Sequence, residues 1–328
     1  MNKALIYKVL QNIFNVYDIN KLKFENINDF LFDYTLVVNK TLFLCQVKKV
    51  IVTKANFGLI LKRMLKLRKE VNEQILFITK KIDPQLMNEL IKHGINCIDM
   101  YGNCRIQTKE FIIHIEGKKD NISPLLADFS KRRTLSTIEL KILFYILIDK
   151  DFLNNTYRFI QNKTQVSLGS ITMTMKKLEM EGFLFSIENK KFIRKKKELL
   201  ERWIIGYNEN LKPKLFLRRM TFRNQEVKNN WTKIKLPDNC YWGGEPAAYM
   251  EQEFLYPEIF TIYSNTELIN FIRCGLKPDD NGEIFIYEKF WNFESEKNTT
   301  PILLTYADLI GSGISRNIEA ANKLYSNE

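Results

Sequence analysis

The sequence predicts an α+β protein of several domains, and three observations lead to this fold class. The chain has 328 residues, enough for two or three domains of ordinary size. Apolar runs with helical spacing and short β-branched runs occur together at both ends of the chain, whereas the middle is mainly helical in pattern. The net charge also differs between the three regions: it is +8 over residues 1–126, +10 over 127–220 and −6 over 221–328. The domains are therefore expected over residues 1–122, 127–198 and 199–328.

The N-terminal domain is predicted to be a mixed α/β structure. Met1–Tyr17 has apolar residues at helical spacing with polar residues between them, which is typical of an amphipathic helix rather than of a signal peptide. Strands are expected next over Phe30–Val38 and Thr41–Lys48, separated by the turn Asn39-Lys40. The later elements are expected to be a helix over 57–71, a strand over Ile75–Thr79, a helix from Asp83-Pro84 to Gly94, a strand over Ile95–Ile98, a turn over Asp99–Asn103, and a strand over Phe111–Ile115.

The order of the elements, together with Asp33, Gln46 and Lys48, resembles the PD-(D/E)xK nuclease fold, which is the restriction-endonuclease-like fold. The resemblance implies that Asp33 on one strand and Gln46 on the next could hold a divalent cation such as Mg²⁺, and that Lys48 would share their face and orient water. Gln46 replaces the usual acid of that family, leaving one clear carboxylate for a cation that prefers several oxygen ligands. The alternative is a degenerate fold without activity, with Asp33 as a strand-edge charge and Lys48-Lys49 as a solvated strand end.

The cysteines and the apolar runs indicate in which cellular compartment the protein is expected. The chain has five cysteines and two histidines, without a CxxC pair, so neither a disulfide framework nor a zinc site is predicted. The longest apolar run, Ile142–Ile148, is too short to cross a bilayer. We expect a cytoplasmic protein without a membrane partner, a metal or another cofactor. The net charge of +12 indicates a polyanionic partner.

The middle domain has the pattern of a winged helix-turn-helix. Ser136-x-x-Glu139 is the spelling of a capping box before a largely buried helix that includes Ile138 and ends near Asp149. A short helix over Thr156–Asn162 and a turn over Thr164–Val166 follow. The remaining elements are a helix capped by Ser167 that runs to about Glu181, a stop at Gly182, and a hairpin of Phe183–Ile187 and Lys191–Arg194 around Asn189-Lys190.

The third helix of this unit is predicted to read double-stranded DNA. Its inward face is expected to be Leu168, Ile171, Met175 and Leu178, which leaves Ser170, Thr172, Met173, Thr174, Lys176 and Lys177 for solvent or a groove. Short polar side chains can approach base edges, and cations can meet phosphates. The candidate DNA-binding residues are Ser167, Gly169, Ser170, Thr172 and Lys176 near the groove, Lys177, Lys190, Lys191 and Arg194 for phosphates, and Tyr157. The alternative is a protein-interaction module with a solvated charge run.

Four ordered blocks of residues give a more specific signal. They are Asp151–Arg158 with Val166–Ser170, Leu199–Trp203 with Leu211–Leu215, Trp242–Ala248, and Tyr306–Leu309 with Arg316–Ala321. Together they resemble the AbiEi-family antitoxins and transcriptional regulators of type IV toxin–antitoxin systems, in the branch with a nuclease-like N-terminal domain.

The resemblance implies a function. Such proteins repress their own promoter by binding inverted repeats, and their C-terminal part counteracts a nucleotidyltransferase-type toxin without needing a stable complex with it. The oligomeric state stays open. The alternative function is a Mg-dependent DNA endonuclease targeted by the winged helix, with Asp33 and Gln46 at the metal and Lys48 beside it.

The acidic C-terminal part is predicted to mix strands and helices. Gly243-Gly244-Glu245-Pro246 could hold a phosphate at a helix start, but Glu245 would repel an anion, so a structural turn is favoured. The expected strands lie over Ile259–Tyr263 and Glu283–Tyr287, and the expected helices lie near Pro246–Phe254, Thr266–Ile272 and Ser315–Tyr325.

Overall fold

The computed structural model describes residues 3–15, 22–27, 31–118, 135–188, 190–295 and 297–325. The chain divides into two compact units, Met1–Arg132 and Arg133–Glu328, and each is described by itself. No helix within the described residues has both the length and the apolar character needed to cross a membrane.

A seven-stranded sheet forms the centre of the first unit, with its strands in sequence order. The three central strands β3, β4 and β5 are parallel, and the outer pairs are antiparallel. The strands are β1 (Leu22–Asn26), β2 (Tyr34–Val38), β3 (Thr41–Val52), β4 (Gln74–Ile82), β5 (Ile95–Asp99), β6 (Cys104–Gln107) and β7 (Ile112–Ile115). The helices are α1 (Lys3–Asn15), α2 (Lys54–Glu70) and α3 (Pro84–Lys92).

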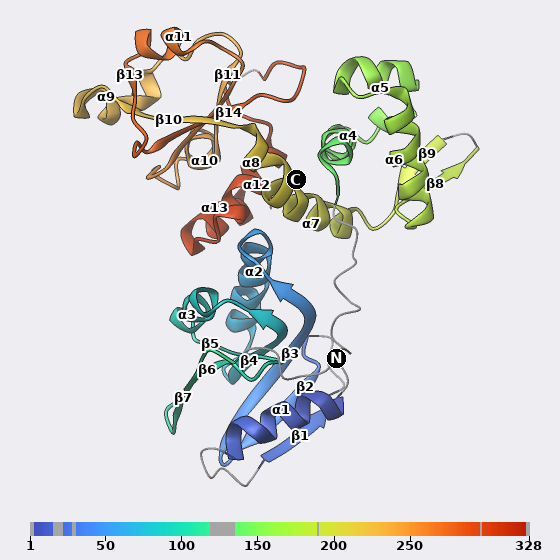
Figure 1. Cartoon of the computed structure of the whole chain (residues 1–328), viewed down its shortest axis with the longest axis vertical. Coiled ribbons are helices and arrows are strands. Elements are labelled where there is room, and N and C mark those ends of the chain that lie inside the picture. Colours follow the sequence, from blue (N-terminus) through green and yellow to red (C-terminus); the bar gives the residue numbers. More distant parts are fainter. Residues whose placement is uncertain are drawn as a thin grey trace. The chain divides into compact units, whose positions relative to one another are not determined.

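Helices cover both faces of this sheet (Figure 1). α1 packs on one face, in a core cluster that includes Leu76 and Ile78 of β4. Ile75 and Phe77 point to the opposite face because strand residues alternate, and they are buried as well. α2 and α3, which contact each other, supply the buried side chains of that second face. A strand buried on both faces reads as a continuous apolar run, which is how β4 reads in the sequence.

The expected elements of the first unit are present, with some corrected bounds. β3 runs on to Val52, and α2 begins at Lys54 because Thr53 and Asn56 form a capping box. β1 and β6 were not predicted. The predicted end of the first helix at Tyr17 lies outside the described residues, and so does Phe30, the predicted start of the strand that is observed as β2.

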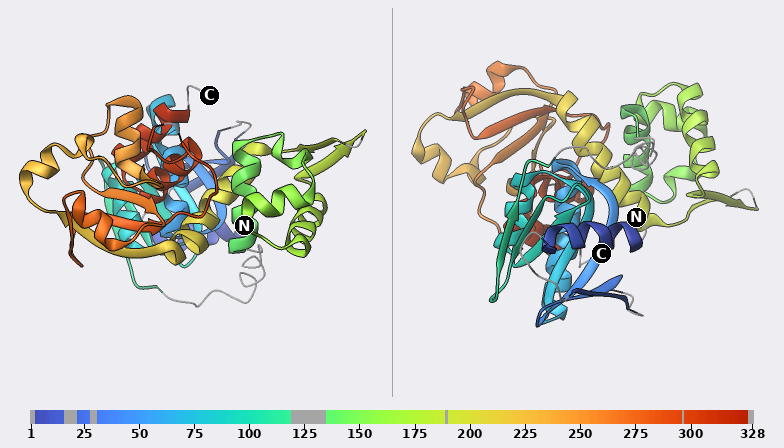
Figure 2. Two further views of the ribbon diagram at one scale, coloured as in Figure 1. Left: turned by 90° about the horizontal axis from the view of Figure 1, so that it is seen from above. Right: turned by 60° about the horizontal axis from the view of Figure 1, so that its bottom comes forward.

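The second unit begins with a helical module, the α4–β9 module, over residues 135–193. Helix, short helix, turn, helix and hairpin follow one another in the predicted order. Its elements are α4 (Thr137–Ile148), the 3-10 turn η2 (Phe152–Asn154), α5 (Tyr157–Thr164), α6 (Leu168–Met180), β8 (Leu184–Ile187) and β9 (Lys190–Ile193). The β8–β9 hairpin projects away from the helices (Figure 2).

A five-stranded sheet in the order β11-β12-β14-β10-β13 forms the rest of the second unit. β12 and β14 are parallel, and the other pairs are antiparallel. The strands are β10 (Phe216–Phe222), β11 (Cys240–Gly243), β12 (Phe260–Ser264), β13 (Leu276–Pro278) and β14 (Ile284–Glu288). The helical segments are α7 (Lys196–Gly206), the π-helix η3 (Tyr207–Leu211), α8 (Lys212–Leu215), α9 (Gln225–Asn229), η4 (Trp231–Lys233), α10 (Gly244–Gln252), α11 (Leu268–Arg273), α12 (Ile302–Ser312) and α13 (Ser315–Tyr325).

α4 joins the module to this sheet region. Trp203 of α7 stacks on Phe144 of α4, and its indole N–H donates to the Leu140 carbonyl at 2.8 Å. The hydroxyl of Tyr145 donates to the Lys163 carbonyl at 2.7 Å and accepts the backbone N–H of Asn292 at 2.8 Å. These buried contacts extend from the module to segments more than a hundred residues later, so the module is packed into the second unit rather than attached by a linker.

Candidate nucleic-acid interface

The turn between α5 and α6 is built from capped helix ends. Thr156 caps α5, since its hydroxyl accepts the Phe159 N–H at 3.2 Å. Gln165 ends α5 in the left-handed conformation, at φ 55°. Ser167 then starts α6 by accepting the Ser170 N–H at 3.3 Å. Each cap satisfies backbone groups that a helix end leaves free, so two helices can follow each other across three residues.

α6 presents a stripe of exposed residues along one face. Gly169, Thr172, Met173 and Lys176 are three or four positions apart and lie at or near the surface, with the side chain of Met173 74% exposed. A Cβ at Gly169 would meet no atom within 4 Å. The absence of a side chain there therefore serves no packing purpose within the described chain, and it leaves the backbone open to close approach.

The predicted division of α6 into two faces was wrong at two positions. Thr174 was expected at the surface but is buried, because its hydroxyl donates to the Ser170 carbonyl at 2.8 Å and so needs no water. Leu168 was expected inside but is 39% exposed, and Val166 fills the interior at this end of the helix. Similarly, Ile138 of α4 is 43% exposed rather than buried.

The hairpin after α6 carries the cations. Lys190 and Arg194 are exposed, and the guanidinium of Arg194 lies over the Phe185 ring, 4.8 Å from its centroid. Lys191 is half-buried, since its ammonium lies 4.6 Å from the centroid of Tyr157 and donates to the Tyr157 hydroxyl at 3.1 Å. Lys190 was expected in the turn but begins β9, and the neighbouring Asn189 lies outside the described residues.

One of the candidates, Lys177, serves the fold of the module. The ammonium of Lys177 donates to the carboxylate of Glu139 at 2.7 Å, and both side chains are largely buried. Burial raises the pKa of Glu139, but Lys177 and the N–H of Ser136 outweigh it and hold that pKa below its usual value. This ion pair ties α6 to α4, so the charge of Lys177 is already compensated within the protein.

Sequence reasoning missed Asn154, which fixes the hairpin. Its side chain accepts the Lys191 N–H at 2.8 Å and donates to the Lys191 carbonyl at 3.4 Å. This is the pairing that a strand would make, supplied by a side chain from the η2 turn. No local pattern in the sequence could reveal it, because the two residues are 37 positions apart.

The structure places Asp33, Gln46 and Lys48 on neighbouring segments of the first unit. Gln46 and Lys48 share one face of β3, and Asp33 directly precedes β2, which pairs with β3. The Asp33 carboxylate accepts the Val47 N–H at 2.7 Å, whereas Gln46 donates to the Leu31 carbonyl at 2.8 Å and keeps its buried Oε1 without a hydrogen-bond partner in the described structure.

This donor set does not fit a hard divalent cation. It supplies one carboxylate that already accepts a hydrogen bond and one amide oxygen, whereas such cations take about six oxygen ligands, several of which are usually carboxylates. Within the described residues there is no cluster of three or more His, Cys, Asp or Glu side chains that could hold a metal ion. We therefore derive no catalytic step from these three residues.

The C-terminal part contains a buried polar cluster that the sequence did not reveal, the Asp308 cluster of Tyr207, Lys212, Tyr263 and Asp308. The Asp308 carboxylate accepts both tyrosine hydroxyls at 3.0 Å and the Lys212 ammonium at 2.7 Å. The two hydroxyls also hydrogen-bond each other. Burial and the negative charge of Asp308 raise the pKa of both tyrosines, so both remain protonated donors.

A π-helix positions two members of this cluster. In η3 the N–H of Lys212 bonds to the carbonyl of Tyr207, five residues earlier, which places both side chains on one side of the helix. Gly243 packs against the ring of Tyr263, and a Cβ at this position would lie only 2.7 Å from that ring. The π-helix and Gly243 therefore both help to place the tyrosines beside Asp308.

A second network explains the turn before α10. Glu245 is buried, and its carboxylate accepts the Glu258 N–H at 2.7 Å, the Arg316 guanidinium at 2.7 Å and the Asn317 amide at 2.9 Å. These contacts fasten α10 to α13 through Glu245, in keeping with the structural turn expected for Gly243-Gly244-Glu245-Pro246.

A family model matches the C-terminal part of the chain. No curated protein and no solved structure matches the chain. Residues 191–328 match the model of the family described as "Transcriptional regulator, AbiEi antitoxin, Type IV TA system". The match includes η3, α10, α12 and α13, and therefore both buried networks. Over residues 191–328, the chain is therefore similar to the AbiEi antitoxin family of transcriptional regulators of type IV toxin–antitoxin systems.

Proposed function

We propose that the protein is a DNA-binding transcriptional autorepressor and the antitoxin of a type IV toxin–antitoxin system. The α4–β9 module acts as a winged helix-turn-helix on double-stranded promoter DNA. The C-terminal part counteracts a nucleotidyltransferase-type toxin, without a stable complex between the two proteins. The family match of residues 191–328 supports the antitoxin role.

The observation that carries the DNA-binding proposal is the exposed stripe of α6 beside a cationic hairpin. Gly169, Thr172 and Lys176 offer a polar, sterically open helix face near the start of α6. Such a face can enter the major groove, while the cations of the hairpin meet phosphates on either side. The segment 127–220 carries a net charge of +10, the most positive part of the chain.

The proposed contacts follow from exposure and from existing partners. Near the groove they are Ser167, Gly169, Ser170, Thr172 and Lys176. At the phosphates they are Lys190 and Arg194, with Lys191 and Tyr157 acting as a joined pair at the base of the hairpin. Lys177 is left out, because Glu139 already compensates its charge.

The test is binding of the full-length protein to fluorescent duplex DNA from upstream of its own reading frame, over a range of salt concentrations. Replacing both Lys190 and Arg194 by Ala should lower the slope of log affinity against log salt by about two, roughly one for each phosphate that is no longer neutralised. Lys277→Ala, an exposed site on β13 in the acidic part, is the matched control. An unchanged slope in the double variant would show that the hairpin does not contact DNA.

A metal-dependent DNA endonuclease is the second candidate function. The observation that favours it is the buried Oε1 of Gln46, on the strand next to Asp33, for which the described residues supply no hydrogen-bond partner. Incubation of the protein with DNA and Mg²⁺ or Mn²⁺ decides this candidate. Cleavage that Lys48→Ala abolishes would establish it, and intact DNA would exclude it under those conditions.

A further inference from the structure

A pocket of about 560 Å³ opens in the first unit at the carboxyl ends of the three parallel strands. Val52 ends β3, Ile82 ends β4 and Asp99 ends β5, and all three line the pocket. The carboxyl ends of parallel strands are where open α/β sheets bind ligands. The volume lies within the range of about 300–1,000 Å³ that small organic ligands occupy. Asp33, Gln46 and Lys48 are not among the residues that line it.

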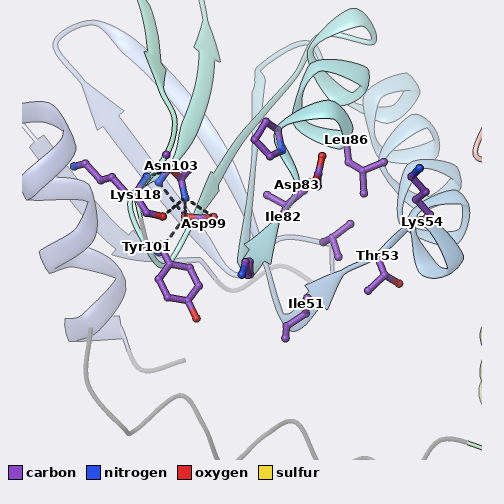
Figure 3. A pocket seen from close by; sticks show the side chains of 14 residues that line it. Ile51, Thr53, Lys54, Ile82, Asp83, Leu86, Asp99, Tyr101, Asn103 and Lys118 are labelled. Carbon is purple, nitrogen blue, oxygen red and sulfur yellow. Dashed lines mark hydrogen bonds between the residues drawn. The ribbon is translucent and has the colours of Figure 1, made fainter. Parts of the chain in front are cut away.

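Lysines come to this pocket from three different elements. Lys54 is the first residue of α2, Lys81 lies near the end of β4, and Lys118 follows β7; all three are exposed. Figure 3 shows Lys54 and Lys118 on opposite sides of the pocket. α2 has no acidic residue in its first turn, so Lys54 adds positive charge where the helix dipole is already positive. This placement costs helix stability and concentrates positive charge at the pocket.

The two acidic residues of the lining are engaged with the protein itself. Asp83 caps α3 by accepting the Gln85 N–H at 2.9 Å. Asp99 accepts the N–H groups of Tyr101 and Asn103 at 3.0 and 2.9 Å, and the side-chain amide of Asn103. These carboxylates shape the walls, as the hydrogen bonds around Asp99 show in Figure 3. Both carboxylates keep their negative charge, so the three lysines leave the pocket lining with a net charge of +1.

The rest of the lining is mainly apolar, with one aromatic ring and the polar side chains of Thr53 and Asn103. Ile51, Ile82 and Leu86 form apolar walls, and the turn that Asp99 folds presents the Tyr101 ring on the side facing Thr53 and Lys54 (Figure 3). The ammonium of Lys81 lies 5.7 Å from the centroid of that ring. A ligand that fits must therefore combine a flat apolar part with several negative charges.

We propose that this pocket binds a nucleotide, with the base against the Tyr101 ring and the phosphates between Lys54, Lys81 and Lys118. Lysine contacts phosphate as a point charge, and three of them around one cavity suit a polyphosphate or a terminal phosphate better than a single carboxylate. The nucleotide can be free or can be the end of a strand, because both carry the same chemistry.

Calorimetric titration of the full-length protein tests this proposal. The probes are ATP, GTP, CTP and UTP, a 5′-phosphorylated tetranucleotide, and inorganic pyrophosphate. Lys54→Ala and Lys81→Ala should each weaken nucleotide binding about 5- to 10-fold, while Lys109→Ala, an exposed lysine outside the pocket, should leave it unchanged. Tyr101→Leu should weaken binding of nucleotides but not of pyrophosphate. Thermal melting of each variant confirms that it is folded.

The outcomes distinguish a free nucleotide from a strand end, and they distinguish a failure of nucleotide binding from a failure of promoter binding. Tighter binding of the triphosphates indicates a free nucleotide, and tighter binding of the tetranucleotide indicates a strand end. No binding of any probe at about 1 mM, or equal losses in the pocket variants and in Lys109→Ala, would overturn the proposal. Such a failure leaves promoter binding untouched, because Lys190 and Arg194 belong to the other unit and the titration contains no duplex DNA.

Discussion

The carboxylate of Asp308 is expected to be the main electrostatic support of the second unit. Asp308→Asn keeps the shape of the side chain but removes the negative charge that the Lys212 ammonium contacts at 2.7 Å. It also replaces one of the two acceptor oxygens that the hydroxyls of Tyr207 and Tyr263 and the ammonium of Lys212 share. The variant therefore leaves an ammonium without its counter-ion and removes one acceptor from the buried cluster.

The size of the effect follows from burial. Removing one partner of a buried ion pair costs about 3–5 kcal/mol of unfolding free energy. The Asp308 side chain is 2% exposed, but that of Lys212 is 20% exposed, so some water reaches the ammonium. We therefore expect Asp308→Asn to cost about 3 kcal/mol, at the lower end of this range. Lys212→Met should cost less, since Asp308 keeps both tyrosine donors.

Urea unfolding followed by tryptophan fluorescence measures these costs. All four tryptophans lie in the second unit, and Trp203 stacks directly on Tyr207 of the cluster, with ring centroids 5.1 Å apart. In the double variant Asp308→Asn/Lys212→Met no charge is left unpaired. The free energy of unfolding that the double variant loses should be smaller, by about 2 kcal/mol, than the sum of the losses in the two single variants. Additive losses, or less than about 1 kcal/mol for Asp308→Asn, would refute this account of the cluster.

Two further predictions concern a close backbone contact and a pH-sensitive ion pair. Gly311→Ala should cost about 2–3 kcal/mol of unfolding free energy, because its Cβ would lie 2.1 Å from the Oδ1 of Asn208, whose amide is held by two carbonyls. Gly169→Ala is the matched control and should leave stability unchanged or slightly higher, since its Cβ meets nothing within 4 Å. The Glu139 carboxyl has a lowered pKa in the folded state. Its contribution to folding stability is therefore complete above its pKa in the unfolded state, and it is lost as the pH falls through its pKa in the folded state. Thermal melts between about pH 6 and pH 3 should therefore show a steeper loss of stability for the wild type than for Glu139→Gln, and parallel curves would contradict the assignment.

Local chemistry in the sequence was enough to predict how many of the elements begin and end. The capping box of Ser136 and Glu139, the Asp83-Pro84 start of α3 and the stop at Gly182 are all confirmed. Each depends on hydrogen bonds or dihedral angles within about four residues, which a sequence displays directly. The same holds for the turn at Asp99, whose carboxylate folds the next four residues.

Contacts between distant segments could not be predicted in this way. Helical spacing placed Thr174 at the surface, because spacing alone does not show that a hydroxyl can bond to its own helix. The Asp308 cluster joins residues 207 to 308, and its π-helix depends on a backbone irregularity for which the sequence has no simple signature. The proposed nucleotide pocket was equally hidden, since its lysines come from positions 54, 81 and 118.

The two buried networks explain why the blocks that resemble the AbiEi family are scattered along the sequence. Lys212, Gly243 and Asp308 come from three separate blocks and meet in one cluster, while Glu245 and Arg316 meet in the second. Tyr207 of the first cluster stacks on Trp203, which bonds to α4 of the proposed DNA-binding module. A continuous chain of buried contacts therefore connects the α10–α12 region with α4. Since α4 also holds α6 through Glu139 and Lys177, the residues of the Asp308 cluster are connected through buried contacts to the proposed recognition helix.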